Sequence, residues 1–584
     1  MDVNSLFHRA EQAYLAGEPA TARADVEQVL KLVGDHPAVF HLLALIDKQL
    51  GNQEAARLAF ERALCLAPDN VEIAANAGNF YLGISNHVEA LRAFTLALAG
   101  QPDHAGALHG RGACYAELGQ FDRARADYQR AADIAPRDPK PWIALGALAR
   151  RQGDLETAAN AFDRALGIAP VAPIALHGRA RVALERGEHD AAQRFTEVER
   201  LLPDDQQVAL GAAEALVLRN RDEAITRLRS VIARYPDWAD AHSALARLLW
   251  ESGKRDGFAC ELEKAVLQQP LNLPMWRALI GAYNGVDRHL DAAEAAARAG
   301  QATGGDASFR LMEAGHASEG GDIERANALF RDIPPLPGGV ATEARHRLKS
   351  GEVERAAALL EAGRADASSD IALWAWTGIV WRLTDDARSE WLHQPDRLIT
   401  AQQLAATSED LDTITSYVEN LHHEGSFPIG QSLRGGTQTR GRLLEGADDV
   451  PRRLRAIVAT TVETYWQALP AEDLSHPLLC HRLRTPRIAG SWSVRLVNGG
   501  FHVAHIHPRG LLSSACYLRV PQTDEPAGWL ELGRPPADLG LDLTPLRFVQ
   551  PLPGRIVLFP SYLHHGTIPF DKGDRLSVAF DVEA

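Results

Sequence analysis

Residues 105–138 read AGALHGRGACYAELGQFDRARADYQRAADIAPRD, and this stretch aligns without a gap with residues 37–70, 71–104 and 139–172 at 34-residue steps. The first helix, the turn and the second helix of this unit are marked by Leu108, Gly112, Tyr115, Gly119, Ala124, Tyr128 and Ala131. Glycine or alanine where two helices touch lets their axes approach, and aromatic rings fill the gaps between successive pairs. Because such a phase is hard to obtain by chance, it predicts a stack of similar helix pairs.

The 34-residue phase extends beyond these four units in both directions. An atypical unit covers residues 3–36, and later units cover 173–206, a shortened 207–238, 239–272 and 273–306, before the pattern decays over 307–370. The pattern resembles the tetratricopeptide repeat, which implies an α-solenoid of about ten helix pairs over residues 1–371, with degenerate last repeats. Such arrays usually present a concave surface to other proteins, so we expect a peptide or protein partner in the repeat groove.

The composition excludes several classes of function. The chain has 584 residues, a formal net charge of −15 and five cysteines, which lie far apart and form no CxxC pair. The acidic balance argues against binding to nucleic acid or to an anionic membrane surface. Scattered cysteines favour a reducing compartment, and no window has the roughly 18 apolar residues that a membrane span needs. We therefore expect a cytoplasmic protein that binds neither nucleic acid nor membrane, and the sequence leaves its oligomeric state open.

The repeat phase is lost after about residue 372, where the pattern changes. Residues 372–425 are predicted to form a helical connector, and a further helix is expected between Pro451 and Pro470. Short apolar runs with a period of two then follow: GSWSVRLV, SSACYLRVP, GWLELG, RIVLFP and RLSVAFDV. Glycine, proline and aspartate separate these runs, which is typical of a compact antiparallel β domain. Residues 426–584 are therefore predicted to form a β sandwich or jelly roll with flanking helices.

Histidines gather at the ends of two of these predicted strands. His505 and His507 lie two residues apart, so on an extended segment both imidazoles point to the same side. His564 and His565 follow another strand about sixty residues later, and Arg575 lies ten residues beyond His565. A guanidinium group matches a carboxylate in two parallel hydrogen bonds. This is the layout of non-haem iron oxygenases that use 2-oxoglutarate, whose usual triad is two histidines and one carboxylate.

In these motifs the chain resembles a family of bacterial and phage 2-oxoglutarate/iron(II) oxygenases, whose members often carry tetratricopeptide repeats upstream. The resemblance is carried by PIGQSLRGGTQTRG, SWSVRLVNGGFHVAHIHPRGLLSSACYLRVP, GWLELGRP and PGRIVLFPSYLHHGTIPFDKGDRLSVAFDV, between residues 428 and 582. It implies a double-stranded β-helix that binds Fe(II), with 2-oxoglutarate as cosubstrate. By position, it implies that the iron ligands and catalytic residues are His505, His507 and His565. Arg575 is then implied as the anchor of the cosubstrate.

Further candidate residues lie near these motifs, and Tyr517, Arg495 and the glycine-rich loop each have a structural alternative. Ser577 shares a strand face with Arg575 and can add a hydroxyl donor to the cosubstrate. Tyr517, on the strand after the first histidines, can add another, and a core position is its alternative. The candidates for substrate contact are Arg434, Thr437 and Arg495. The first two lie in a glycine-rich loop that is either shaped for substrate or purely structural.

Two assignments within the predicted metal site are open. His507 stands where the broad superfamily usually has Asp or Glu, so a different third ligand is an alternative. Three-histidine iron sites also occur in cupins that use HxH, but the Glu that usually follows in cupins is absent from PRGLLSS. His564 competes with His565 as the distal ligand. His502 is interpreted as a supporting or surface group.

The resemblance implies a dioxygenase that hydroxylates a peptide or protein side chain recruited by the repeat solenoid. One alternative is a repeat-based interaction scaffold whose jelly roll binds a metal but is catalytically inactive. Another is a repeat-fused transferase of sugar or sulfate, which the absence of a phosphate-cradling loop disfavours. Convergence of the three histidines on one metal would favour the dioxygenase over the inactive scaffold.

Overall fold

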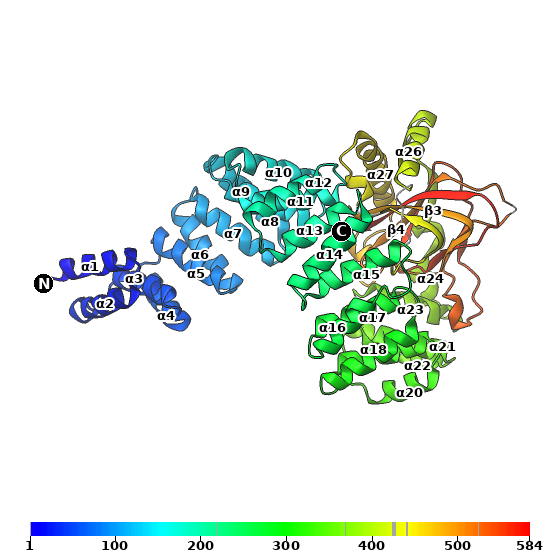
Figure 1. Cartoon of the computed structure of the whole chain (residues 1–584), viewed down its shortest axis with the longest axis horizontal. Coiled ribbons are helices and arrows are strands. Elements are labelled where there is room, and N and C mark those ends of the chain that lie inside the picture. The colour runs from blue at the N-terminus through cyan, green and yellow to red at the C-terminus, as the bar shows by residue number, and fades with distance from the viewer. Residues whose placement is uncertain (1, 218, 368, 423–427, 440–441, 524) are drawn as a thin grey trace. The chain divides into compact units, whose positions relative to one another are not determined.

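The computed structural model describes residues 2–217, 219–367, 369–422, 428–439, 442–523 and 525–584. The chain divides into two compact units, Met1–Val182 and Ala183–Ala584. Helix pairs make up the first unit and the N-terminal part of the second, and antiparallel strands lie in the C-terminal part of the second (Figure 1). The predicted fold class, a tetratricopeptide solenoid followed by a jelly roll, is confirmed.

Glycines set the spacing of the helices in the first unit. These helices are α1 (Val3–Leu15), α2 (Pro19–Val33), α3 (Pro37–Gln49), α4 (Gln53–Leu66), α5 (Val71–Gly83), α6 (His87–Gly100), α7 (Ala105–Glu117), α8 (Phe121–Ile134), α9 (Lys140–Arg151), α10 (Leu155–Ile168) and α11 (Pro173–Glu185), which ends in the second unit. The ring of Phe94 on α6 meets Gly78 on α5 and Gly110 on α7. A Cβ atom at these glycines would lie 2.6 and 2.3 Å from the ring, so no larger residue fits without a shift.

The same packing continues in the second unit. Its repeat helices are α12 (Ala191–Leu201), α13 (Gln206–Leu216), α14 (Arg221–Arg234), α15 (Ala239–Glu251), α16 (Cys260–Gln268), α17 (Leu273–Asn284), α18 (His289–Ala302), α19 (Ala307–Glu319), α20 (Ile323–Asp332), α21 (Gly339–Lys349) and α22 (Val353–Asp366). The ring of Phe195 on α12 would lie 2.3 Å from a Cβ atom at Gly211 on α13. Helix pairs therefore persist through α22, although the sequence phase decays over 307–370.

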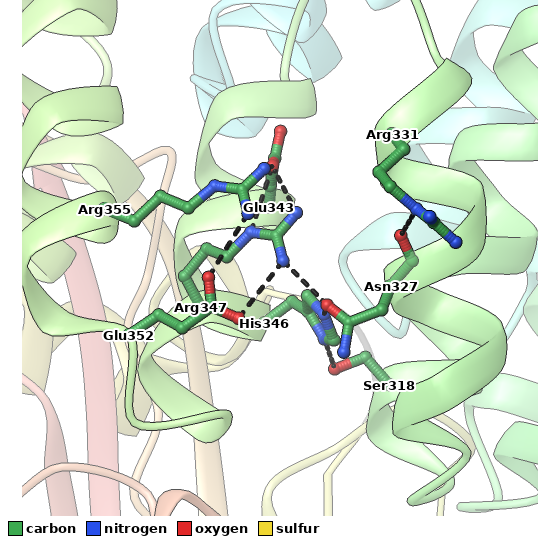
Figure 2. A network of polar contacts seen from close by, with 8 residues as sticks. All are labelled: Ser318, Asn327, Arg331, Glu343, His346, Arg347, Glu352 and Arg355. Atoms are coloured by element: carbon green, nitrogen blue, oxygen red, sulfur yellow. Dashed lines mark hydrogen bonds and ion pairs between the residues drawn. The ribbon is translucent and has the colours of Figure 1, made fainter.

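A buried polar network joins the last repeats (Figure 2). Arg347 on α21 is 1% exposed, and its guanidinium donates to Glu343 Oε1 at 2.8 Å and to Asn327 Oδ1 at 2.7 Å. The neighbouring His346 ring contacts Ser318 Oγ at 2.9 Å and Asn327 Oδ1 at 3.1 Å. A buried guanidinium is tolerated only when carboxylates and amides satisfy it. These polar contacts tie α19, α20 and α21 together where the repeat pattern weakens.

Helix α23 (Ile371–Leu383) links the repeats to the β domain. It is apolar on all sides, as expected for a helix surrounded by other elements. On one side Trp376 packs with residues of α21 and α22. On the other side Trp374 and Trp381 lie in the core of the β domain, with ring centroids 5.9 and 6.3 Å from that of Trp391.

The range 372–425, predicted as a helical connector, also contains a strand. Helix α23 begins one residue before this range. Helices α24 (Arg388–His393), α25 (Pro395–Leu398) and α26 (Ser408–Leu421) lie within it, and so does strand β1 (Thr400–Gln403). β1 pairs with a strand near the C-terminus, so this range contributes directly to the larger β-sheet. The predicted boundary at 425/426 lies outside the described residues, and the predicted domain limits remain predictions.

Two antiparallel sheets form the jelly roll. Its strands are β2 (Leu433–Gln438), β3 (Arg487–His502), β4 (Leu512–Arg519), β5 (Leu530–Leu532), β6 (Arg547–Val549), β7 (Arg555–Pro560), β8 (His565–Thr567) and β9 (Asp574–Glu583). The larger sheet has the order β1-β7-β4-β9-β3-β2, and the smaller one β6-β5-β8. Helices α26 and α27 (Asp449–Ala468) pack with the core of the larger sheet.

Strand β9 shows how the sequence divides the two faces of the larger sheet. Leu576, Val578 and Phe580 lie in the core beneath the helices. The alternate residues, which include Arg575 and Ser577, line a cavity on the opposite face. This follows from the period of two in a strand, because successive side chains point to opposite faces. Across the described ranges, we find no helix that combines the length and apolar character of a membrane span.

Candidate active site

A cavity of about 930 Å³ lies in the second unit. Residues of both β-sheets line it, together with residues of the loop between α17 and α18. The histidines His502, His505, His507 and His565 face this cavity, and so do Arg575 and Ser577. Residues that are more than 200 positions apart in the sequence, such as Asn284 and His505, therefore share one cavity.

Three histidines converge at the wall of this cavity. His505 and His507 follow the end of β3, and His565 begins β8. An isolated β-bridge joins the backbones of His505 and His565, with N–H···O distances of 3.1 and 2.9 Å. One ring nitrogen from each of the three histidines lies within 4.8 Å of the others, and His505 Nε2 is 3.1 Å from His507 Nε2. This grouping is the kind that binds a single metal ion.

Hydrogen bonds on the far side of each ring orient the three imidazoles. Nδ1 of His505 lies 2.8 Å from the carbonyl oxygen of Val503, and Nδ1 of His565 lies 3.0 Å from that of Leu563. A carbonyl only accepts, so Nδ1 carries the proton in both rings and Nε2 keeps its lone pair. Burial lowers the pKa of His505 to about 3, and the nearby His507 contributes to that shift. Burial also holds the pKa of His565 well below its usual value, so both rings are neutral at pH 7.

Asp581 on β9 orients the third ring. Its Oδ1 lies 2.5 Å from Nδ1 of His507, and Ser513 donates a hydrogen bond of 3.2 Å to the same oxygen. Ser513 is itself 2.9 Å from Ser561 through their hydroxyl groups. Asp581 was not among the residues predicted for the site, although it lies six residues after Arg575 and therefore on the same strand face. A carboxylate behind a metal-binding imidazole fixes the ring and raises its basicity.

The Asp581→Asn variant is expected to bind a divalent metal about 10- to 100-fold more weakly, because outer carboxylates usually contribute this much. Anaerobic titration of the metal-free protein with Fe(II) or Co(II) measures the affinity. Asp574→Asn is the matched control, since Asp574 lies on the same strand but pairs with Arg495 and Arg519. Equal metal affinities for the two variants would show that Asp581 has no influence on the metal.

The predicted cosubstrate anchor is a buried arginine beside a tyrosine. Arg575 is 3% exposed, Nη1 donates to the carbonyl of Gly528 at 2.9 Å, and the guanidinium lies 5.2 Å from the ring centroid of Tyr517. Within the described part of the chain, Arg575 Nε and the Tyr517 hydroxyl are both buried without a hydrogen-bond partner. Burial lowers the pKa of Arg575 and raises that of Tyr517. Buried unpaired donors are costly, and an anionic oxygen ligand would satisfy them.

Two further histidines lie on different sides of the site. His502 lines the cavity, and its Nδ1 is 2.9 Å from the hydroxyl of Ser432, which is also 3.2 Å from Nε2 of His505. His564 instead stacks on Trp376 of α23, with ring centroids 4.7 Å apart, and is not among the residues that line the cavity. The structure therefore groups His565, and not its neighbour, with His505 and His507.

The three residues predicted to contact substrate do not line the cavity. Arg434 pairs with Asp287 at 2.6 Å, the Thr437 hydroxyl lies 2.8 Å from His422, and Arg495 pairs with Asp574 at 3.0 Å. Strand geometry explains one of them, because Val494 of β3 faces the cavity and its neighbour Arg495 faces away.

Comparison with known families agrees with both parts of the chain. A family model described as "Putative 2OG-Fe(II) oxygenase" matches residues 490–581. Tetratricopeptide-repeat models match residues 37–70, 105–138, 143–206 and 210–272. The chain thus carries tetratricopeptide repeats and a C-terminal domain that matches the 2-oxoglutarate/iron(II) oxygenase model.

Curated relatives match only part of the chain. Protein FlbA of Caulobacter vibrioides is 27% identical over 153 residues, which are 26% of this chain and 26% of FlbA. Tetratricopeptide repeat protein 6 of Homo sapiens is 31% identical over 138 residues, 23% of this chain and 26% of that protein. The chain spans about a quarter of the length of these two relatives.

Solved structures that resemble the chain also cover only part of it. The type IV pilus biogenesis factor PilW is 25% identical, with a TM-score of 0.33, over 35% of this chain and 96% of PilW. A tetratricopeptide repeat protein from Parabacteroides merdae is 16% identical, with a TM-score of 0.34, over 40% of this chain and 92% of that one.

Proposed function

We propose that the jelly roll is a 2-oxoglutarate- and iron(II)-dependent dioxygenase that hydroxylates a peptide or protein side chain recruited by the repeats. The observation that carries this proposal is the convergence of His505, His507 and His565, with ring nitrogens within 4.8 Å of one another. These rings line a cavity that also contains the buried Arg575. The match of residues 490–581 to the oxygenase model supports the same assignment.

The donor set suits an iron(II) ion held on one face. His505 and His565 offer neutral imidazoles whose protons are on Nδ1, and His507 offers Nε2 while Asp581 holds its other nitrogen. Three protein ligands leave coordination positions for a cosubstrate and dioxygen. When bound together, iron(II) and 2-oxoglutarate supply oxidation of a substrate C–H bond by dioxygen, with release of succinate and carbon dioxide.

The residues of this chain bind and orient the reactants. Arg575 presents to a carboxylate its Nε, which has no hydrogen-bond partner among the described residues. The Tyr517 hydroxyl is a second such donor, and Ser577 adds a hydroxyl at the cavity wall. The low polarity around Arg575 strengthens its attraction for a carboxylate. Arg575 and His565 are buried in the cavity wall, so the protein binds and orients the reactants there while the cofactor supplies the oxidation chemistry.

Succinate formation tests this proposal directly. The full-length protein, purified anaerobically, is loaded with iron(II) and 2-oxoglutarate and then exposed to oxygen, and succinate is quantified against samples that lack iron. We expect slow turnover even without substrate, because dioxygenases of this kind release succinate in an uncoupled reaction. If iron is retained but no succinate forms, the jelly roll belongs to an inactive, metal-binding scaffold. If iron is not retained either, the metal site itself is refuted.

A further inference from the structure

The repeat solenoid contributes directly to the wall of the catalytic cavity. Asn284, Gly285, Asp287 and His289, in and around the loop that joins α17 to α18, line the cavity together with the histidines of the jelly roll. All of these residues belong to the second compact unit. A substrate that reaches the histidines therefore meets repeat residues on the same surface.

This loop is fastened to the segment that leads into β2. The N–H of Gly430 donates to the carbonyl oxygen of Gly285 at 2.8 Å, and Arg434 pairs with Asp287 at 2.6 Å. Ile429 packs against the apolar core of the neighbouring repeats. A backbone hydrogen bond, an ion pair and an apolar contact together fix the position of the loop. The predicted substrate residue Arg434 thus acts as part of this attachment.

The fastened segment continues to the metal site. Two residues after Gly430, the hydroxyl of Ser432 lies 2.9 Å from Nδ1 of His502 and 3.2 Å from Nε2 of His505. Gly430, which is bonded to the loop, is only two residues from Ser432, which contacts His505. A displacement of the loop is therefore expected to shift the hydroxyl that contacts His505. The repeats and the predicted iron ligands form one continuous structure.

The chemistry of this wall fits a polypeptide. Asn284 carries an amide group, and its Oδ1 lies 3.2 Å from Nδ1 of His289. Gln431, just before β2, and Gln438, at the end of β2, also carry amide groups and line the cavity. Amide side chains both donate and accept, as a peptide backbone requires. The volume of about 930 Å³ is at the upper end of the range for small-ligand sites, which leaves room beside a small diacid.

We propose that the α17–α18 loop is the surface against which a polypeptide substrate lies while its side chain reaches the histidines. This inference rests on the proposed dioxygenase function. It assigns the solenoid a role in selecting the modified residue, in addition to any role in recruiting the protein that contains it. Asn284 and His289 are then positioned to determine specificity.

Gly285 allows a variant that disturbs this surface without removing a functional group. Its backbone has φ −67° and ψ −7°, which alanine adopts readily, so the backbone itself causes no strain. The added Cβ atom would lie 2.2 Å from Cγ2 of Ile429 and 3.0 Å from the nitrogen of Gly430, which forces the loop and the segment apart. Gly281→Ala is the matched control: Gly281 lies one turn earlier in α17, and among the residues that the structure describes, apart from the backbone of its own helix, nothing lies within 4 Å of the added atom.

The test offers a random decapeptide library to the iron-loaded full-length protein with 2-oxoglutarate, and mass spectrometry identifies peptides that gain one oxygen atom. We expect wild type and Gly281→Ala to oxidise the same peptides. For the preferred peptide, Gly285→Ala is expected to lower kcat/KM at least tenfold, mainly through KM, and to change the ranking of peptides. An unchanged ranking with kcat/KM within twofold of wild type would overturn the proposal.

Two further outcomes separate this inference from the function on which it rests. If the wild type forms succinate but oxidises no peptide, a polypeptide substrate is refuted and the dioxygenase stands. If it forms no succinate, the dioxygenase itself is refuted. If Gly285→Ala fails to fold, Asp287→Asn takes its place: it breaks the ion pair with Arg434 without adding bulk. This variant is also expected to raise the KM for the preferred peptide. No change in KM for that variant would also count against the proposal.

Discussion

The His565→Ala variant is expected to lose about 100-fold or more in affinity for iron(II). The ring nitrogen of His565 lies within 4.8 Å of those of His505 and His507, so its removal leaves two of the three proposed ligands. Structural metal sites with four ligands reach binding free energies of about 10–16 kcal/mol, so one ligand accounts for about 3 kcal/mol, or about 100-fold. Anaerobic equilibrium dialysis of the full-length protein against iron(II) measures this loss.

The adjacent histidine provides the control for this experiment. His564 is also buried, but it stacks on Trp376 and does not line the cavity. Its replacement by alanine is expected to lower thermal stability through lost packing while leaving iron affinity within a few-fold of wild type. If His564→Ala lost iron and His565→Ala kept it, the distal ligand would have been assigned to the wrong histidine.

The Arg575→Met variant is expected to raise the KM for 2-oxoglutarate by roughly 30-fold to several thousand-fold. Removal of one partner of a buried charge pair costs about 2–5 kcal/mol, which corresponds to this range. Methionine retains much of the apolar volume, and it removes a buried charge for which the described residues offer no ion-pair partner. In the absence of 2-oxoglutarate, the variant is therefore expected to be as stable as the wild type or more stable. Initial rates of succinate formation and thermal unfolding give the two measurements.

Arg487→Met is the corresponding control for a surface arginine. Arg487 lies at the start of β3 and forms an exposed ion pair with Glu583 at 2.8 Å. Exposed pairs contribute at most about 1 kcal/mol, so both KM and stability are expected to remain close to those of the wild type. A KM for 2-oxoglutarate that is equal in the two variants would remove Arg575 from the cosubstrate site.

The parts of the structure that the sequence predicts are those governed by local periodicity. The 34-residue phase predicts the solenoid, because small residues such as Gly78 recur in several units next to a ring like that of Phe94. The period of two in the last strand places Arg575 and Ser577 on one face, and the structure places both at the cavity. The same period places Asp581 on this face, but its contact with His507 joins two segments that lie 74 residues apart, so periodicity alone does not predict it.

Contacts between distant segments could not be predicted in this way. The repeat phase treats every unit alike, so it contains no signal that the loop after α17, and not another, meets Gly430. Strand β1 was missed because TAQQ, residues 400–403, is short and has no apolar alternation of its own. Its pairing with β7 supplies the hydrogen bonds that make it a strand.

The backbone bridge between His505 and His565 has a consequence for metal exchange. Because two reciprocal hydrogen bonds hold these residues together, the sheet itself fixes their separation before any ion arrives. Binding of an ion between these two residues needs little further ordering of the chain. The loss of conformational entropy therefore reduces the binding free energy only slightly. The empty protein is therefore expected to keep its fold, and different divalent ions can enter and leave a preorganised pair of ligands. For the proposed metal site, cellular metal supply, more than the folding of the chain, is then expected to determine which ion binds.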